Sequence, residues 1–148
     1  MIIRNMLSED ALAMANIEKS IFSQPWSKKG FLEAYNQKQN IILVADEEGE
    51  ICGYICMYVS FDEGEITNVA VKEKYRGRGL GKAIVKDLLD RAAKANVSRC
   101  ILEVRKSNAP AISLYKKMNF NEIGVRKGFY DFPKEDALIM EYIKKDEE

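Results

Sequence analysis

The chain has 148 residues, of which 47% are hydrophobic and 31% charged, as is usual for one soluble globular domain. Its 23 Lys and Arg residues balance 23 Asp and Glu residues, so it lacks the strong positive charge that binds nucleic acid, and no nucleic-acid partner is expected. The absence of histidine excludes Ser-His-Asp and Cys-His nucleophilic sites, histidine-containing zinc sites and facial-triad iron sites.

Apolar runs and cysteines indicate the compartment. The longest apolar run, 41–45, has the length of a strand and not of a membrane span, so no membrane partner is expected. No basic segment followed by an apolar stretch opens the chain, so no signal peptide is expected. Cys52 and Cys56 would lie roughly 13 Å apart along a strand, too far for a disulfide or a shared metal. With Cys100 they are interpreted as buried thiols, and we expect a cytoplasmic monomer without a metal.

The N-terminal segment predicts one strand and two helices. Residues 2–6 are typical of a short strand, and Ser8 is expected to cap a helix that runs to about Phe22. Pro25-Trp26-Ser27 then interrupts the helical pattern. The hydroxyl of Ser27 is expected to cap a second helix.

Three strands are predicted in the middle of the chain. Residues 40–47 and 50–60 are strands joined by a Glu48-Gly49 turn, which indicates a hairpin. A third strand at 65–71 follows a turn at Asp62-Glu63-Gly64.

Helical periodicity begins at Leu80. Apolar residues at helical spacing predict a long helix over 80–95. A short β-rich run follows at 100–104, and Asn108, with Pro110 in the first turn, opens another helix that ends near Asn119.

The C-terminal segment predicts two last strands, 121–126 and 137–143, joined by a long loop, and a charged tail at 144–148. The resulting order is β-α-α-β-β-β-α-β-α-β-β. A hairpin start, one helical crossover and a closing pair predict an α/β fold with a mixed sheet and helices on both faces. We expect residues 1–148 to form a single domain.

A glycine-rich segment separates the 65–71 strand from the long helix. Its residues are Arg76-Gly77-Arg78-Gly79-Leu80-Gly81-Lys82. Glycines let backbone N–H groups curl around an anion, and the helix N-terminus adds free N–H donors and partial positive charge. This pattern favours a pyrophosphate ligand. It fits neither a P-loop nor a Rossmann fingerprint, and a solvated turn without a ligand is the open alternative.

Two further side chains could carry proton transfer. Glu103 lies between Leu102 and Val104 in a strand, so its carboxylate is expected on the opposite face of the sheet. A salt bridge to Lys or Arg is the alternative interpretation of that carboxylate. Tyr115 lies on the next helix, where an aromatic residue usually packs in the core.

The glycine segment is similar to the pyrophosphate loop of the GNAT superfamily of N-acetyltransferases, and the element order is also theirs. Further segments resemble one branch, the bacterial ribosomal-protein alanine N-acetyltransferases (the RimI family). They are Phe22-Ser23-Gln24-Pro25-Trp26-Ser27, Asn68-Val69-Ala70-Val71, Leu102-Glu103-Val104-Arg105, Ser107-Asn108, Ala111-Ile112-Ser113-Leu114-Tyr115, Tyr130 and Glu135-Asp136-Ala137-Leu138-Ile139-Met140. Asn119-Phe120 stands where members usually carry Gly-Phe, and Phe129-Tyr130 replaces the commoner Tyr-Tyr pair.

The resemblance implies an acetyl-CoA-dependent enzyme that acetylates a protein N-terminal amine, that of the alanine of small-subunit ribosomal protein eighteen. It assigns Glu103 as general base and Tyr115 as general acid. It also implies a set of residues that bind the cofactor: Val69, Ala70, Val71, Arg76, Gly77, Arg78, Gly79, Leu80, Gly81, Lys82 and Asn108.

Three alternatives stay open. Glu65 is the rival base, because other members of the superfamily place theirs on that earlier strand. The acceptor could instead be a small-molecule amine, since such enzymes share every catalytic feature. A non-catalytic acyl-CoA sensor would keep the glycine segment but would need neither Glu103 nor Tyr115.

Overall fold

The computed structural model describes residues 1–145 and confirms the predicted element order, with two short 3₁₀ helices in addition. Its elements are β1 Ile2–Asn5, η1 Ser8–Asp10, α1 Ala11–Ile21, α2 Lys28–Asn36, β2 Ile41–Glu47, β3 Glu50–Ser60, β4 Glu63–Val71, η2 Glu73–Tyr75, α3 Leu80–Lys94, β5 Arg99–Arg105, α4 Ala109–Lys117, β6 Asn121–Tyr130 and β7 Glu135–Ile143. Residues 146–148 of the expected charged tail lie outside the described residues.

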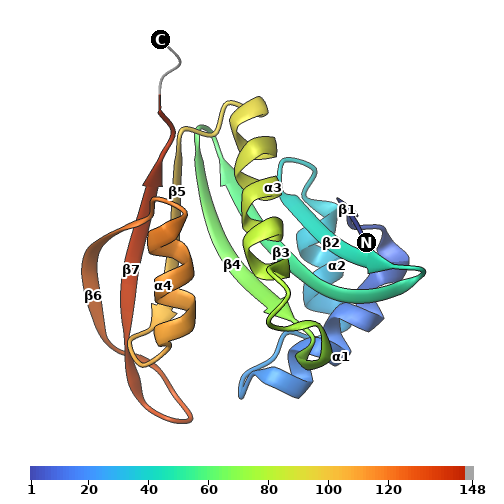
Figure 1. Ribbon diagram of the computed structural model, residues 1–148, viewed down its shortest axis with the longest axis horizontal. Helices are drawn as coiled ribbons and strands as arrows, with labels where there is room; N and C mark the ends of the chain where they lie inside the picture. Colours follow the sequence, from blue (N-terminus) through green and yellow to red (C-terminus); the bar gives the residue numbers. More distant parts are fainter. Residues whose placement is uncertain (146–148) are drawn as a thin grey trace.

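The seven strands form one mixed sheet in the order β1-β2-β3-β4-β5-β7-β6. Neighbouring strands pair antiparallel except β4 and β5, which are parallel and are connected by α3 as a crossover helix. In Figure 1, α3 and α4 lie in front of the sheet and α1 and α2 lie behind it.

The strands divide their apolar residues between two cores. In β2, Leu43 packs toward the core beneath α3 and α4, while the next residue, Val44, packs toward the core beneath α1 and α2. Ile84 and Leu88 of α3 are fully buried in the first core, and Phe31 of α2 is fully buried in the second. Both faces of β2–β4 are therefore covered by helices.

The pairing of β4 with β5 stops halfway along both strands. The ladder joins 63–66 to 99–102, and the segments 68–71 and 103–105 continue without pairing to each other. Figure 1 shows the two strands diverging below this point. A wedge-shaped gap in the backbone of the sheet results.

A β-bulge in β4 coincides with the start of this divergence. Cys56 pairs with Asn68 while the next residue of β3, Met57, pairs with Ile66, so Thr67 is the extra residue. An extra residue reverses which face the following side chains occupy. Accordingly, Ile66 packs in the α3/α4 core and Ala70 packs in the α1/α2 core.

Two of the predicted helix caps are confirmed and one is wrong. The side chain of Ser27 accepts a hydrogen bond from Gly30 N at 3.3 Å, and Asn108 accepts one from Ala111 N at 3.3 Å. Ser8 does not cap α1, because it lies in η1. Asp10 caps this turn instead, accepting from Leu7 N at 2.7 Å. Asn119, which stands where family members usually carry Gly, adopts the left-handed conformation with φ 71°, which Asn also tolerates.

The long loop expected between the last two strands is wrong. Strand β6 continues to Tyr130 and β7 begins at Glu135, so only residues 131–134 connect them. Gly128 N donates to Asp136 Oδ1 at 2.8 Å across the hairpin. Arg105 also donates to the carbonyl oxygens of Asp131 and Pro133, at 3.1 and 2.9 Å. These contacts connect β5 with the β6–β7 hairpin. They depend on residues far apart in the chain, so the local sequence pattern could not predict them.

Cysteine burial agrees with the sequence analysis. Cys52, Cys56 and Cys100 are free and buried, as predicted. Within residues 1–145, no helix combines the length and apolar character needed to cross a membrane.

Candidate active site

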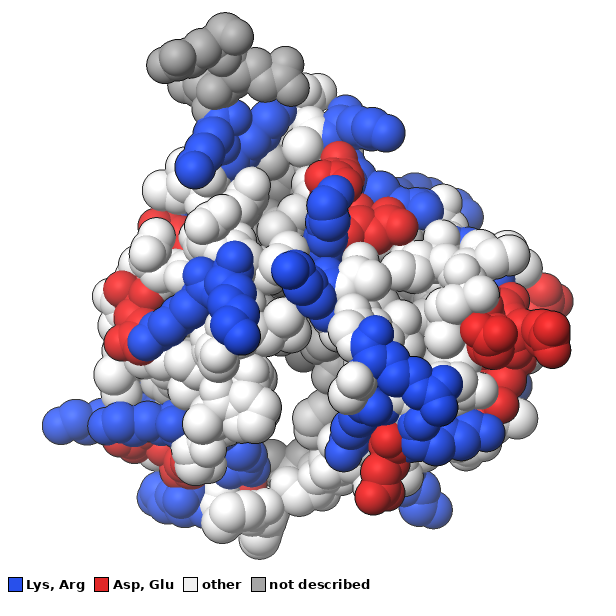
Figure 2. Space-filling view, in the orientation of Figure 1, with Lys and Arg blue, Asp and Glu red and all other residues white. Residues whose placement is uncertain are grey.

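The wedge between β4 and β5 opens through the molecule. Figure 2 shows an opening between the half that carries β4 and α3 and the half that carries α4, β5, β7 and β6. Backbone N–H and C=O groups of 68–71 border it on one side, unpaired with β5. Such an edge can bind an extended molecule in the way that a strand binds a neighbouring strand.

The glycine segment lies at the α3 side of this opening. Gly77 and Gly79 have positive φ values of 79° and 76°, and Gly79 is the N-cap of α3. A Cβ atom built on either glycine would meet no atom within 4 Å, so open space faces both residues. Backbone N–H groups at a helix N-terminus beside open space suit a phosphate group. The segment therefore fits the pyrophosphate of an acyl-CoA.

Positive side chains surround this segment, and Figure 2 shows Lys and Arg side chains grouped there. Arg76 Nε donates to the Val71 carbonyl at 3.0 Å, and the Arg78 guanidinium lies 5.4 Å from the centre of the Tyr75 ring. Gly81 and α4 also approach each other, because a Cβ on Gly81 would lie 3.5 Å from Leu114. The predicted residues 69–71 and 76–82 thus share one side of the wedge. Asn108 begins α4 on its other side.

Glu50 anchors the segment that precedes the glycines, and sequence reasoning missed it. Its carboxylate accepts hydrogen bonds from Lys72 Nζ at 2.9 Å, Lys74 Nζ at 3.0 Å and the Tyr75 hydroxyl at 3.1 Å. Hydrogen bonds from Lys74 and Lys72 lower the pKa of Glu50 to about 2. Glu50 therefore stays ionised and holds η2 against β3 at neutral pH.

Glu103 lies on β5 at the face opposite to its apolar neighbours, as predicted. Leu102 and Val104 are buried in the α3/α4 core, whereas the Glu103 side chain points away from that core and is 18% exposed. Arg126 Nη1 lies 3.4 Å from Glu103 Oε1, so the salt-bridge alternative is also realised. Burial raises the pKa of the Glu103 carboxyl; Arg126 opposes this shift and Glu65 adds to it.

Tyr115 lies on α4, across the sheet from Glu103. Its ring is buried and packs against Phe120 with centroids 5.5 Å apart. Burial, with a smaller contribution from Tyr130, raises the pKa of the Tyr115 hydroxyl to about 12. The hydroxyl is therefore protonated at neutral pH and available as a proton donor.

Tyr130 connects these two side chains electrostatically. Burial and the Glu103 carboxylate raise the pKa of the Tyr130 hydroxyl. Tyr130 in turn contributes to the raised pKa of the Tyr115 hydroxyl. The Arg105 guanidinium lies over the Tyr130 ring, 4.4 Å from its centre. The family resemblance pointed to Tyr130, but only the folded hairpin indicates what it contacts.

A buried carboxylate on α1 holds β4 from the sheet face opposite to α3. Glu18 accepts hydrogen bonds from Trp26 N at 2.9 Å, the Tyr54 hydroxyl at 2.8 Å and Asn68 Nδ2 at 3.3 Å. Asn68 is 7% exposed, and its Oδ1 is buried without a hydrogen-bond partner. The Pro25-Trp26 turn is thereby held against β4 at the bulge.

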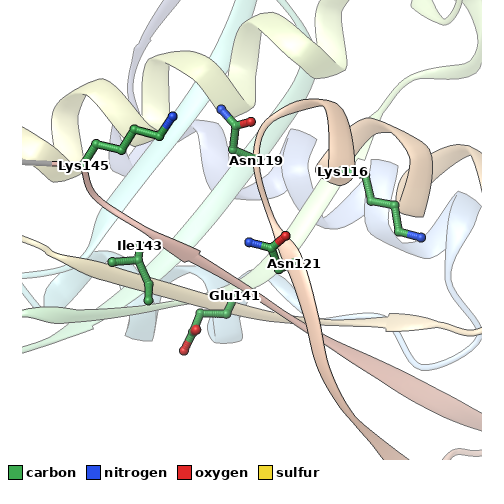
Figure 3. A pocket seen from close by; sticks show the side chains of 6 residues that line it. All are labelled: Lys116, Asn119, Asn121, Glu141, Ile143 and Lys145. Carbon is green, nitrogen blue, oxygen red and sulfur yellow. The ribbon is translucent and has the colours of Figure 1, made fainter.

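A second cavity lies outside this site, and no metal-binding group is found among the described residues. A cavity of about 290 Å³ lies near the C-terminal end of α4 and shares no residue with the wedge (Figure 3). It is lined by Lys116, Asn119, Asn121, Glu141, Ile143 and Lys145. Among residues 1–145, no group of three or more Cys, Asp or Glu side chains is placed to hold a metal ion.

A split mixed sheet, with a helix N-terminus suited to an anion on one face and a carboxylate on the other, is the arrangement expected of an acyl-CoA-dependent transferase. The model of the acetyltransferase (GNAT) family matches residues 11–120, and the chain belongs to this family. It is an acetyl-CoA-dependent N-acetyltransferase.

Individual relatives match almost the whole chain. A Bacillus subtilis protein is 38% identical over 139 residues, covering 93% of this chain and 92% of its own length. The ribosomal protein bS18-alanine N-acetyltransferase of Escherichia coli K12 is 36% identical over 141 residues, covering 93% of this chain and 94% of its own length. The crystal structure of the Escherichia coli ribosomal-protein-S18-alanine N-acetyltransferase superposes with a TM-score of 0.90 at 34% identity, covering 99% of this chain and 96% of that one.

The glycine segment generates a binding prediction. Gly79→Val should weaken acetyl-CoA binding by about tenfold or more, because valine resists positive φ and its side chain would enter the space that faces the loop. Isothermal titration calorimetry measures the affinity, and circular dichroism checks the fold. Gly49→Val is the matched control, because Gly49 also has positive φ and open space but lies in the β2–β3 turn. Equal affinities in both variants would contradict the assignment of the loop.

Proposed function

We propose that this enzyme acetylates the N-terminal alanine of ribosomal protein bS18, with Glu103 as general base and Tyr115 as general acid, in a single domain over 1–148. The observation that supports these roles is that Glu103 follows the last β5 residue paired with β4, on the sheet face away from the α3/α4 core, whereas Tyr115 lies in that core. The bS18-alanine activity of the Escherichia coli relative supports the choice of acceptor.

Glu103 performs the first proton transfer. An α-amino group has a pKa of about 8, so most of it is a protonated ammonium at neutral pH and cannot attack a carbonyl carbon. Glu103 removes this proton, directly or through water, and burial raises the pKa of its carboxyl toward that of the amine. Its position on the sheet face away from α3 and α4 puts it on the acceptor side.

Tyr115 performs the last proton transfer. Its hydroxyl lies on the α3/α4 side, where the glycine segment binds the donor. Because its pKa is about 12, it holds a proton at every working pH and can pass it to a departing thiolate sulfur.

The remaining predicted residues bind and orient the donor, which supplies the acetyl group as a thioester. Backbone groups of 69–71 hold the pantetheine arm along the unpaired edge of β4, and an N–H group there stabilises the oxyanion. The backbone of 76–82 binds the pyrophosphate, with Arg76, Arg78 and Lys82 adding positive charge. Asn108 keeps its amide nitrogen for the donor while its oxygen caps α4.

The acceptor lies between two loops. The Pro25-Trp26 turn, held by Glu18, forms one wall, and the 128–133 segment at the tip of the β6–β7 hairpin forms the other. Because the chain has a formal net charge of zero, recognition depends on the first few acceptor residues and their backbone and not on long-range attraction.

The acceptor assignment predicts a substrate ranking. A peptide with the bS18 N-terminus should give a higher kcat/KM than spermidine or an aminoglycoside. Only the peptide can contact both the Pro25-Trp26 turn and the 128–133 segment through its backbone. The assay follows CoA release with acetyl-CoA in excess. The same peptide with a blocked α-amine is the control and should be inactive. A preference for the polyamine would identify a small-molecule acetyltransferase.

The acid assignment predicts a selective loss of turnover. Tyr115→Phe should lower kcat by about 10- to 100-fold while leaving acetyl-CoA affinity unchanged, because only the hydroxyl is removed. Tyr142→Phe is the matched control, since Tyr142 also packs on Phe120, with centroids 5.5 Å apart. Wild-type turnover in Tyr115→Phe would make this residue a core aromatic.

The base assignment predicts the largest loss. Glu103→Gln keeps the size of the side chain but cannot take a proton, so kcat/KM should fall by about two to four orders of magnitude. The loss should shrink as pH rises, because more acceptor amine is then already neutral. Glu65→Gln, which removes the rival base, should change kcat/KM little. Loss of activity in Glu65→Gln with activity retained in Glu103→Gln would reverse the assignment.

A further inference from the structure

The Glu103 carboxylate is paired with a cation that the proton-transfer steps do not use. Arg126 on β6 places Nη1 3.4 Å from Glu103 Oε1. The Arg126 side chain is 58% exposed, whereas that of Glu103 is 18% exposed. A mostly solvated guanidinium thus covers a mostly buried carboxylate, on the sheet face to which the proposed function assigns the acceptor.

We propose that Arg126 is a positioning residue that takes the place of the acceptor ammonium in the free enzyme and is displaced when the acceptor binds. The inference rests on the proposed function, because it needs Glu103 to receive the acceptor proton. Guanidinium and α-ammonium groups carry the same charge and both donate hydrogen bonds to a carboxylate. Either can therefore occupy this position, but not both at once.

The Glu103–Arg126 ion pair has features that allow it to separate. Its separation of 3.4 Å exceeds that of a close ion pair such as Arg4 with Asp10, at 2.8 Å, and solvent around the exposed Arg126 side chain weakens the attraction. The Arg126 guanidinium also lies 5.3 Å from the centre of the Phe129 ring, and this contact does not require Glu103. The β6–β7 register shifts between Arg126 and Tyr130, and Gly128 has φ 61°, so regular pairing does not fix this segment.

The surroundings of Glu103 favour a cation beside it. The groups that face it are Glu65 from β4, Arg126 and Tyr130 from β6, Ile139 directly opposite on β7, and farther along β7 Glu141, which pairs with Arg99 of β5. Two of these neighbours are carboxylates, and only Arg126 is a cation in contact with Glu103 in residues 1–145. An acceptor ammonium beside Glu103 would compensate the negative charge that Arg126 compensates in the free enzyme.

Displacement has a kinetic signature. The pH dependence of kcat/KM reports groups of the free enzyme, and that of kcat reports groups of the enzyme–substrate complex. If Arg126 pairs with Glu103 only in the free enzyme, its removal should alter only the first profile. A permanent counter-ion would affect both profiles, and a purely structural residue would lower activity without moving either.

Arg126→Gln tests the proposal. Without the guanidinium the Glu103 carboxyl protonates more readily, so the acid limb of kcat/KM for the bS18 peptide should move to higher pH by about half to one unit. The acid limb of kcat should stay in place. Arg126→Lys, which keeps the charge, should restore most of the kcat/KM profile. Lys127→Gln removes the same charge one residue further along and should leave both profiles unchanged.

Other outcomes overturn the proposal. If the acid limbs of kcat and kcat/KM moved equally, Arg126 would be a permanent counter-ion of Glu103. If neither limb moved, Arg126 would not influence Glu103. Carbon NMR titration of the Glu103 carboxyl in the free protein gives an independent reading, and an unchanged pKa in Arg126→Gln would also contradict the pairing. Full activity of Glu103→Gln would instead reject the base assignment, so the two failures are distinguishable.

Discussion

The divergence of β4 from β5 is the constraint on which the rest of the site depends. The two strands pair only from 63 to 66 and from 99 to 102, and Thr67 is bulged immediately afterwards. The bulge bends β4 and leaves its later backbone groups unpaired on the side toward β5. A fully paired sheet would have closed the opening and satisfied these groups internally, leaving neither an edge for the donor nor a passage between the two faces.

The opening also gives the two proposed proton-transfer groups separate environments. Glu103 projects from β5 to the face that α3 and α4 do not cover, and Tyr115 projects from α4 beneath the other face. Glu50 shows how strongly surroundings decide the chemistry of one residue type. Three donors keep the pKa of Glu50 low, whereas burial raises the pKa of Glu103. The first carboxylate holds a loop, and the second can exchange a proton.

Buried hydrogen bonds connect the proposed acceptor wall at Pro25-Trp26 to β4. Glu18 binds Trp26 N from the turn after α1 and Asn68 Nδ2 from the bulge of β4. Since a carboxyl group in the interior is costly unless it is hydrogen-bonded, this network tolerates little displacement of either partner. A shift of the Pro25-Trp26 turn would therefore also displace the edge of β4.

Sequence alone determined what depends on neighbouring residues. The element order, the Ser27 and Asn108 caps and the opposite facing of Glu103 follow from local periodicity and capping chemistry, and the glycine segment was recognisable as a candidate anion site. Tertiary structure decided what depends on distant pairing. The short β6–β7 connection and the Glu103–Arg126 pair arise only when β5, β6 and β7 align. Local pattern fixes which way a side chain points, but only strand register decides which charge it meets.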